Sequence, residues 1–134
     1  TIAFAPVSDL KPLTDMPLVY LHLSGTQAES LEPLKGMPLR ALHLDRTPVA
    51  DLKPLAGLPI KELRLDGCVK LRNLTPLSQC TNLEVLVLPR EHGDIGFLRN
   101  LPNLKRLSYH FDRDSSKMET VDQFFRTRSM AARR

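Results

Sequence analysis

Tryptophan is absent from this chain of 134 residues, and aromatic residues make up only 5% of it. No apolar run approaches the roughly 20 residues that a membrane-spanning helix needs, and the chain does not open with the charged and then apolar pattern of a secretory signal. Two cysteines, Cys68 and Cys80, are too few for a disulfide framework and lack the CxxC spacing. We therefore expect no membrane association and a reducing compartment, the cytoplasm.

Catalytic motifs are missing as well. The sequence contains no GxSxG, no Walker loop and no HExxH. The stretch HFDRD at 110–114 lacks the order of a kinase catalytic loop, and Ser108 and His110 have no base-and-orienter set around them. We expect a protein that is not an enzyme and that needs no cofactor.

The net charge of +4 is confined to one end of the chain. Residues 1–104 hold 11 basic and 11 acidic residues, whereas residues 105–134 hold 8 basic and 4 acidic ones. The basic tail contains four arginines, Arg126, Arg128, Arg133 and Arg134. Because no aromatic stacking residues are interleaved with them, we expect a solvated tail rather than a membrane-surface or nucleic-acid site. Weak nucleic-acid binding through this tail remains a third hypothesis for function.

Leucines recur at a nearly fixed period along most of the chain. Five segments share the pattern LxxLxL, and their first residues are spaced 21, 21, 23 and 21 residues apart. The segments are Leu18–Leu23, Leu39–Leu44, Ile60–Leu65, Leu83–Leu88 and Leu104–Tyr109. A period in the twenties is typical of stacked structural repeats that each contact only their neighbours. We expect five short parallel strands whose leucines share one interior.

The second half of each repeat predicts a short helical return. Apolar residues follow each other at every third position, and prolines recur at positions 12, 33, 54 and 76. Proline suits the first turn of a helix, where its missing N–H is not needed, and it forbids a long helix. Asp9, Asp51 and Asn73 each precede a proline by three residues, which indicates N-caps.

This pattern resembles the leucine-rich repeat family, and it is most similar to short bacterial and SDS22-like repeats over roughly residues 7–110. The resemblance implies an α/β right-handed solenoid with a concave parallel sheet, short 3₁₀ or α returns on the convex side and a C-terminal capping helix. The asparagine that usually ends the family's strand motif is replaced by Thr26, Thr47 and Cys68. A hydroxyl or thiol satisfies fewer backbone groups than an amide, so we expect a weaker ladder there. We expect Cys68 and Cys80 to be buried and unreactive.

Two stretches, DLKPLAGLPIKELRLDGC and FLRNLPNLKRLSYHFD, look like repeat arrays of bacteria that are often appended to serine/threonine protein kinases or other signalling modules. In those arrays a short helix with adjacent aromatics follows the last coil, and Phe124 and Phe125 match that position. The resemblance therefore implies attachment to a kinase or another signalling domain in a longer protein.

We expect one domain over residues 1–134, with a partial first repeat at 1–17, five repeat strands with returns at 18–110, and a cap helix with a basic tail at 111–134. In the partial repeat, Val7 begins a return and Ile2 aligns with a strand. This start predicts a chain cut from a longer array; the alternatives are a frayed first coil or one that pairs with another molecule.

The sequence gives two further signals near its C-terminal end. Thr120 followed by Gln123 is a capping box that predicts a helix to about Met130, with Met118 and the two phenylalanines covering the last coil. The stretch PREHGDIG at 89–96 interrupts the repeat pattern and predicts a protruding loop.

Residues between the leucines of each strand should face outward on the concave sheet and form columns about 4.8 Å apart. The residues predicted to bind a protein there are Tyr20, His22, His43, Asp45, Glu62, Arg64, Asp66, Val85, Val87 and Arg106. An amphipathic Tyr20 is a reasonable interface anchor, although an exposed tyrosine without a role is the alternative. Val85, Val87 and Pro89 form either an apolar docking patch or a surface that the 89–96 loop covers.

His22, His43 and Asp45 could form part of a metal site, but no third ligand has a clear claim, so we expect exposed polar residues and no metal. Arg64 between Asp45 and Asp66 either selects a charged peptide or belongs to an ion-pair ladder across the strands. The sequence therefore predicts a non-catalytic module that binds a protein or peptide on its concave face. A structural spacer is the alternative.

Overall fold

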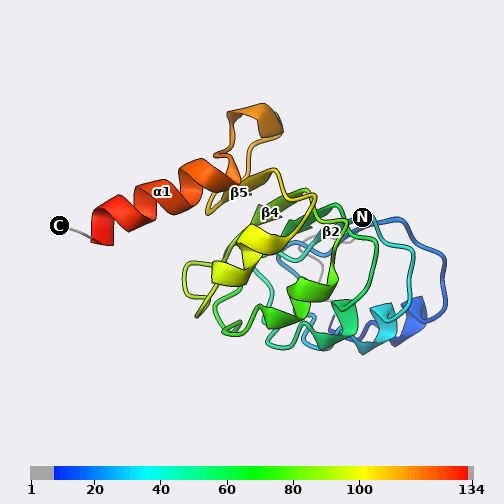
Figure 1. Cartoon of the computed structure of the whole chain (residues 1–134). Helices are drawn as coiled ribbons and strands as arrows, with labels where there is room; N and C mark the ends of the chain where they lie inside the picture. The colour runs from blue at the N-terminus through cyan, green and yellow to red at the C-terminus, as the bar shows by residue number, and fades with distance from the viewer. Residues whose placement is uncertain (1–7, 133–134) are drawn as a thin grey trace.

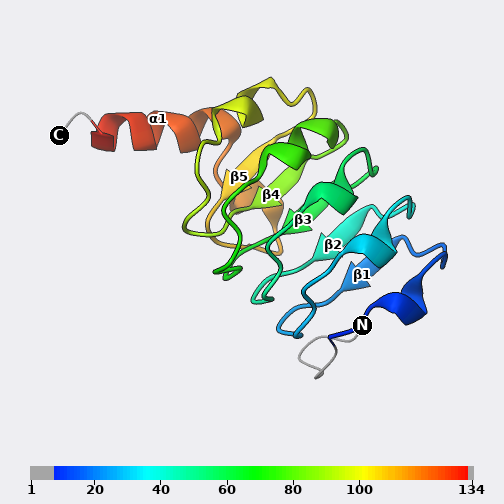
Figure 2. The same cartoon turned by 90° about the horizontal axis from the view of Figure 1, so that it is seen from below.

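Five short parallel strands lie side by side in chain order in one sheet (Figure 2). They are β1 (Tyr20–His22), β2 (Ala41–His43), β3 (Glu62–Arg64), β4 (Val85–Val87) and β5 (Arg106–Ser108). This computed structural model describes residues 8–132, and it describes side chains as far as residue 128. The predicted Ile2 and Val7 of the partial first repeat, and Arg133 and Arg134 of the tail, lie outside the described residues.

The strand register follows the leucine period. The central leucines of the strands pair directly across the sheet in the order Leu21, Leu42, Leu63, Leu86 and Leu107. The first of them is 7% exposed and the other four are fully buried, so one apolar column runs through all five repeats. The prediction of stacked coils with a shared interior is confirmed.

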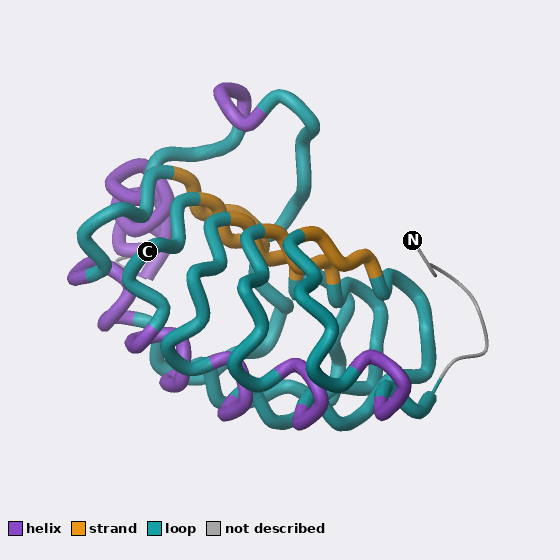
Figure 3. The backbone as a smooth tube through the Cα atoms, turned by 90° about the vertical axis from the view of Figure 1, so that its right-hand side faces the viewer, coloured by secondary structure: helices purple, strands orange, loops and turns teal. Residues whose placement is uncertain are grey.

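Strands and short 3₁₀ returns alternate along the chain from η1 to β5, and the returns lie on the opposite side of each coil from the sheet (Figure 3). The returns are η1 (Lys11–Leu13), η2 (Glu32–Leu34), η3 (Lys53–Leu55), η4 (Thr75–Gln79) and η5 (Gly96–Asn100). Proline occupies the first turn of η1 to η4, as predicted, because its fixed φ and missing N–H suit that position. The apolar side chains of the returns pack against the strand leucines and complete the core.

The polar residues expected to be N-caps lie one position earlier than a cap. Asp9, Asp51 and Asn73 each accept a hydrogen bond from the backbone N–H two residues on, at 2.9 to 3.0 Å. The N-cap itself is a leucine in all three returns, and its side chain makes no capping bond. The predicted side chains therefore stabilise the entry to each return as Asx turns rather than as N-caps.

Hydroxyl and thiol groups fill the position where the family places asparagine. The Thr26 and Thr47 hydroxyls donate to the carbonyls of Leu23 and Leu44 at 2.8 and 2.7 Å. The Cys68 thiol donates to the same Leu44 carbonyl at 3.0 Å. The three groups thus reach two carbonyls, because Thr47 and Cys68 share that of Leu44.

A helix closes the C-terminal end of the stack. A 3₁₀ turn, η6 (Ser115–Lys117), precedes α1 (Val121–Ala132), which extends away from the sheet in Figure 1. The predicted capping box is present, since the Thr120 N–H donates to Gln123 Oε1 at 2.9 Å and the Gln123 N–H to Thr120 Oγ1 at 3.2 Å. Phe124 is 1% exposed and belongs to the core cluster, which identifies α1 as the cap. Within residues 8–132 no helix has both the length and the apolar character to cross a membrane.

Candidate functional site

The face of the sheet that points away from the leucine core, which we call the outer sheet face, carries the residues between the leucines. The predicted columns are present in the strand register. One column contains Tyr20, Ala41, Glu62, Val85 and Arg106, and the next contains His22, His43, Arg64, Val87 and Ser108. Backbone hydrogen bonds from Gly25 to Asp45 (2.8 Å) and from Arg46 to Asp66 (2.9 Å) continue the ladder past the strand ends.

Two histidines stack at the N-terminal end of this face. The imidazole rings of His22 and His43 are parallel within 1°, with centroids 4.1 Å apart. Burial lowers the pKa of His22, and the neighbouring His43 lowers it further. The neutral form of His22 is therefore favoured, which lets its ring stack on His43 without charge repulsion.

Glu62 fixes the orientation of the second histidine. His43 Nε2 and Glu62 Oε2 are 2.7 Å apart. This hydrogen bond is the main reason that the pKa of Glu62 lies below its usual value, against a smaller opposing effect of burial. The His43 side chain is only 12% exposed, so its ring is held between His22 and Glu62.

An ion-pair network continues the polar surface across the next repeat. The Arg64 guanidinium donates to both carboxylate oxygens of Asp66, at 3.3 and 3.0 Å, and lies 3.5 Å from Asp45. The Asp45 carboxylate is fully buried, accepts a hydrogen bond from Ser24 at 2.6 Å and is 3.4 Å from Arg46. A buried carboxylate needs such partners because removing it from water is costly. Of the two hypotheses for Arg64, the contacts favour the ion-pair ladder.

Phe111 lies over this surface, although it comes from the segment that follows β5. Its ring centroid is 4.2 Å from the Arg64 guanidinium carbon and 5.9 Å from the His43 ring centroid, at an interplanar angle of 61°. Phe111 follows β5 in the chain, and β4 lies between β5 and β3. The chain therefore passes over the β4 position Val87, which pairs with Ser108, before the Phe111 ring reaches β3 and β2. The sequence predicts a cap helix and a tail for residues 111–134, and no pattern in it relates Phe111 to Arg64 or His43.

The outer sheet face differs from the expected surface at three residues. Val87 and Asp45 are fully buried, and Pro89 is buried as well. Of the two interpretations of Val85, Val87 and Pro89, the burial of Val87 and Pro89 favours a covered surface over an apolar docking patch. Opposite charges could have indicated the burial of Asp45, since it lies beside Ser24 and Arg64 in the predicted columns.

The remaining predicted residues are reachable from solvent to different degrees. Tyr20 is 69% exposed and is the most open of them, while His22, Glu62, Val85 and Arg106 are half-buried. The Arg106 guanidinium donates to the Met118 carbonyl at 2.8 Å, which occupies one of its donors. The most open position among them is thus Tyr20, at the β1 end of the outer sheet face.

Metal binding finds no support in the geometry. Among residues 8–128, no three His, Cys, Asp or Glu side chains converge as metal ligands would. His43 already uses Nε2 for Glu62, and its ring face is stacked on His22. The histidine pair acts instead as a rigid aromatic surface.

The predicted loop at 89–96 is mostly exposed, but two adjacent residues in its middle contact the body of the solenoid. Arg72 is 3.4 Å from Glu91, and His92 Nε2 is 2.8 Å from the Tyr109 hydroxyl. Between the loop and Val69 lies a cavity of about 150 Å³, lined also by Arg72 and Arg90. That volume is below the range of small-molecule sites, roughly 300–1,000 Å³, so this cavity does not indicate a ligand pocket.

One leucine-centred strand per repeat, 3₁₀ returns opposite the sheet and a helix over the last coil define a leucine-rich repeat solenoid. Solenoids of this kind serve as protein-interaction scaffolds, because stacked repeats present an extended surface. The class of protein is therefore established by the fold.

Comparisons with known proteins agree with this class. No protein-family model matches the chain, and no curated protein matches it. Among solved structures it is similar to internalin C2 of Listeria monocytogenes, with 30% identity and a TM-score of 0.71 over 79% of this chain and 48% of that one. An internalin of the same organism, inlF, is similar at 23% identity and a TM-score of 0.54, over 75% and 37%, which shows the fold alone. The chain thus spans about half the length of internalin C2.

Proposed function

We propose that this chain is a non-catalytic module that binds a protein on the outer, concave face of its sheet. The observation that carries the proposal is the placement of Tyr20. It is 69% exposed at the open end of a face whose other polar side chains are held by defined partners. Exposed tyrosines next to a rigid surface are typical anchors of protein interfaces.

Charge and packing on the rest of the face support the same function. His22, Glu62 and Arg64 are half-buried polar groups in fixed orientations, so they can select a partner without losing much side-chain freedom on binding. Ala41 and Val85 flank Glu62 in the first column, so apolar and charged side chains alternate there. A surface that is rigid, mixed in polarity and open at one end suits a protein or peptide.

The wider setting of the module follows from the family resemblance of the sequence. We propose that it belongs to a larger bacterial signalling protein, with a kinase or another signalling domain attached, and that its repeats are of the SDS22-like kind. The free, buried thiols of Cys68 and Cys80 support a reducing compartment such as the cytoplasm.

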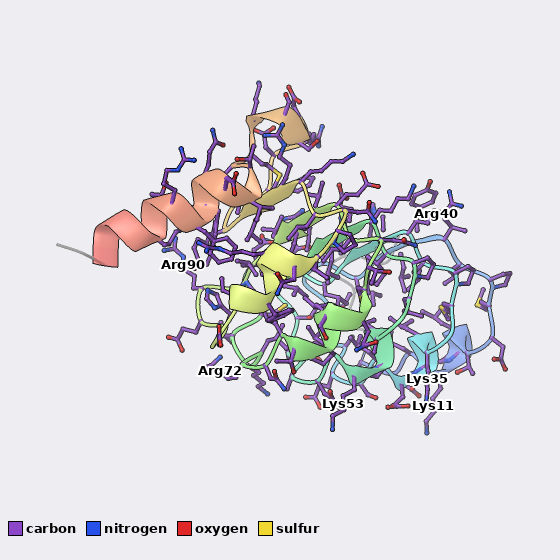
Figure 4. The ribbon with its side chains drawn as sticks, viewed as in Figure 1. Lys11, Lys35, Arg40, Lys53, Arg72 and Arg90 are labelled. Atoms are coloured by element: carbon purple, nitrogen blue, oxygen red, sulfur yellow. The ribbon has the colours of Figure 1, made fainter. Side chains whose placement is uncertain are left out.

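A photo-crosslinking amino acid at Tyr20 tests the proposal. Irradiation in cells of the source organism should give one dominant protein adduct. A matched probe at Lys35 tests the convex side, since Lys35 points away beside the returns in Figure 4. It should not give that adduct.

The adduct counts as the partner only if the purified protein binds the purified domain and loses affinity when Tyr20, His43 and Arg64 are all changed to alanine. Equal adducts from both faces, or unchanged affinity of the triple variant, would favour a structural spacer. Binding that disappears with salt and with deletion of residues 126–134 would favour the nucleic-acid hypothesis.

A further inference from the structure

The segment from Tyr109 to Thr120, which we call the strap, leaves β5 and returns to it. The His110 N–H donates to Ser108 Oγ at 3.1 Å, and on the return the Leu107 N–H donates to the Glu119 carbonyl at 3.1 Å. An isolated antiparallel bridge joins Arg106 and Thr120. In Figure 3 the middle of the strap, which carries η6, rises above the sheet as a separate loop. The strap is thus fastened at both ends beside β5.

Within the strap, Phe111 reaches two repeats away from those fastenings. Its ring lies on the Arg64 guanidinium of β3, at 4.2 Å, and meets the His43 ring of β2 edge-on, at 5.9 Å. We call the surface formed by these two side chains the aromatic seat. A guanidinium and an imidazole both offer planar, polarised faces that attract an aromatic ring. The seat therefore favours an aromatic side chain over other side chains.

The seat keeps its shape through contacts that do not involve Phe111. Asp66 binds the Arg64 guanidinium through both oxygens, and the buried Asp45 lies on its other side. Glu62 and His22 hold the His43 ring by a hydrogen bond and by stacking. Because these contacts persist without the phenyl ring, the seat is preorganised for an aromatic side chain.

The rest of the strap folds on itself. Asp112 Oδ1 accepts the Asp114 N–H at 2.9 Å, and Asp114 Oδ1 accepts both the N–H and the hydroxyl of Ser116, at 3.1 and 2.6 Å. The Lys117 N–H donates to the Asp114 carbonyl at 2.9 Å. Lifting Phe111 from the seat breaks none of these bonds, so the ring can leave while the turn stays intact.

We propose that the aromatic seat binds an aromatic side chain of the protein partner, and that Phe111 occupies the seat in cis until the partner displaces it. This inference rests on the proposed function, because it names the feature of a partner that the outer sheet face recognises. The occupant is a neutral aromatic ring, since Asp66 already pairs with the Arg64 charge and His43 Nε2 is already hydrogen-bonded to Glu62. The neighbouring column offers a contact for the partner beside the seat, since Tyr20 is 69% exposed there and pairs in register with Ala41.

The strap itself supplies the probe for a test. A synthetic peptide with the sequence of residues 108–117, SYHFDRDSSK, is added to a Phe111→Ala variant labelled for NMR of the histidine rings. The His43 ring resonances should shift saturably. The wild-type chain should need at least about tenfold more peptide for the same shift, because its seat is already filled. Amide resonances of β1 to β4 that stay in place show that the variant is folded.

Two controls separate the seat from general stickiness. The same peptide with alanine at both its tyrosine and its phenylalanine positions should cause no shift, and Arg64→Ala in the Phe111→Ala background should abolish the shift. Equal shifts with both peptides, or equal affinity of wild type and Phe111→Ala, would overturn the proposal. A wild-type dimer that Phe111→Ala converts to monomer would also overturn it, since the occupant would then be a second copy.

The experiment needs no natural partner, so its outcome is independent of the proposed function. If the peptide fails to bind while crosslinking at Tyr20 succeeds, the outer sheet face still binds protein but not through this seat. If the peptide binds while the crosslinking fails, the seat accepts an aromatic ring but no protein partner has been found for it. The seat then serves only Phe111 of the same chain, and the claim that it binds a partner is overturned.

Discussion

His22 and His43 occupy equivalent positions in successive repeats, and their rings stack in parallel with centroids 4.1 Å apart. The spacing follows from the parallel register, which pairs the two residues directly. In a stacked repeat, equivalent positions of adjacent strands lie side by side. A side chain that recurs at one position therefore contacts its equivalent in the next repeat and forms a continuous surface. The pair, together with Glu62, forms the rigid end of the outer sheet face.

Acid should destabilise the fold through His22. Burial, and then His43, lower the pKa of His22 from 6.5, so the unfolded chain binds a proton more readily than the folded one as the pH falls below that value. The stability that the neutral ring contributes is therefore lost on acidification. Urea midpoints between about pH 7.5 and 5 should fall less steeply for His22→Gln than for wild type. His110→Gln, an exposed control, should keep the wild-type slope, and a steeper slope for His22→Gln would contradict the account.

Asp45 should be the most costly charge to remove. Its carboxylate is fully buried between Ser24 and Arg64, so Asp45→Ala leaves a hydroxyl and a guanidinium with lost partners. We expect a loss of about 3 kcal/mol in the free energy of unfolding, measured by denaturant titration. Glu91→Ala breaks the exposed pair with Arg72 and should change stability by less than about 1 kcal/mol. Equal effects of the two substitutions would show that burial at Asp45 has been misjudged.

The C-terminal cap should protect the last coil more than the first. Phe124 is 1% exposed and packs against Tyr109, so Phe124→Ala should cost about 3 to 5 kcal/mol. Hydrogen exchange should speed up first at β5, because each repeat contacts only its neighbours. The half-buried Phe125, which lies under Arg99, is the matched control and should cost less when changed to alanine. Uniform loss of protection across all five strands would count against a cap confined to the last coil.

Both thiols should be inert in the folded chain. Burial raises the pKa of Cys68 and of Cys80, and neither side chain is more than 1% exposed. A thiol-specific colorimetric reagent should therefore react slowly under native conditions and with both cysteines after unfolding. Rapid reaction of either cysteine in the native protein would show that its coil opens locally.

The repeating part of the structure was predictable because each repeat carries its own signal. The leucine period gave the register from Leu21 to Leu107, and the prolines gave the short returns. Thr120 and Gln123 predicted the start of α1, since a capping box is local in the sequence. Its helix was expected to end near Met130 and ends at Ala132.

The contacts that were not predicted join residues far apart in the sequence. Phe111 reaches Arg64 and His43 across β4, and no period or motif relates those positions. The columns also predicted that Val87 faces outward, but they did not predict that it is fully buried. The polar side chains at the returns were expected as N-caps but lie one residue earlier, where each accepts the N–H two residues on in an Asx turn.

The central claim is that the outer sheet face, and not the convex face, binds the partner. The most direct test compares the affinity of two triple variants for the crosslinked partner by calorimetry. Tyr20, His43 and Arg64 lie on the outer sheet face, whereas Lys11, Lys35 and Lys53 lie along the returns in Figure 4. Changing the first three to alanine should weaken binding at least about a hundredfold, and changing the three lysines should leave it within about threefold. Comparable losses from both variants, or a loss only from the lysines, would contradict the account.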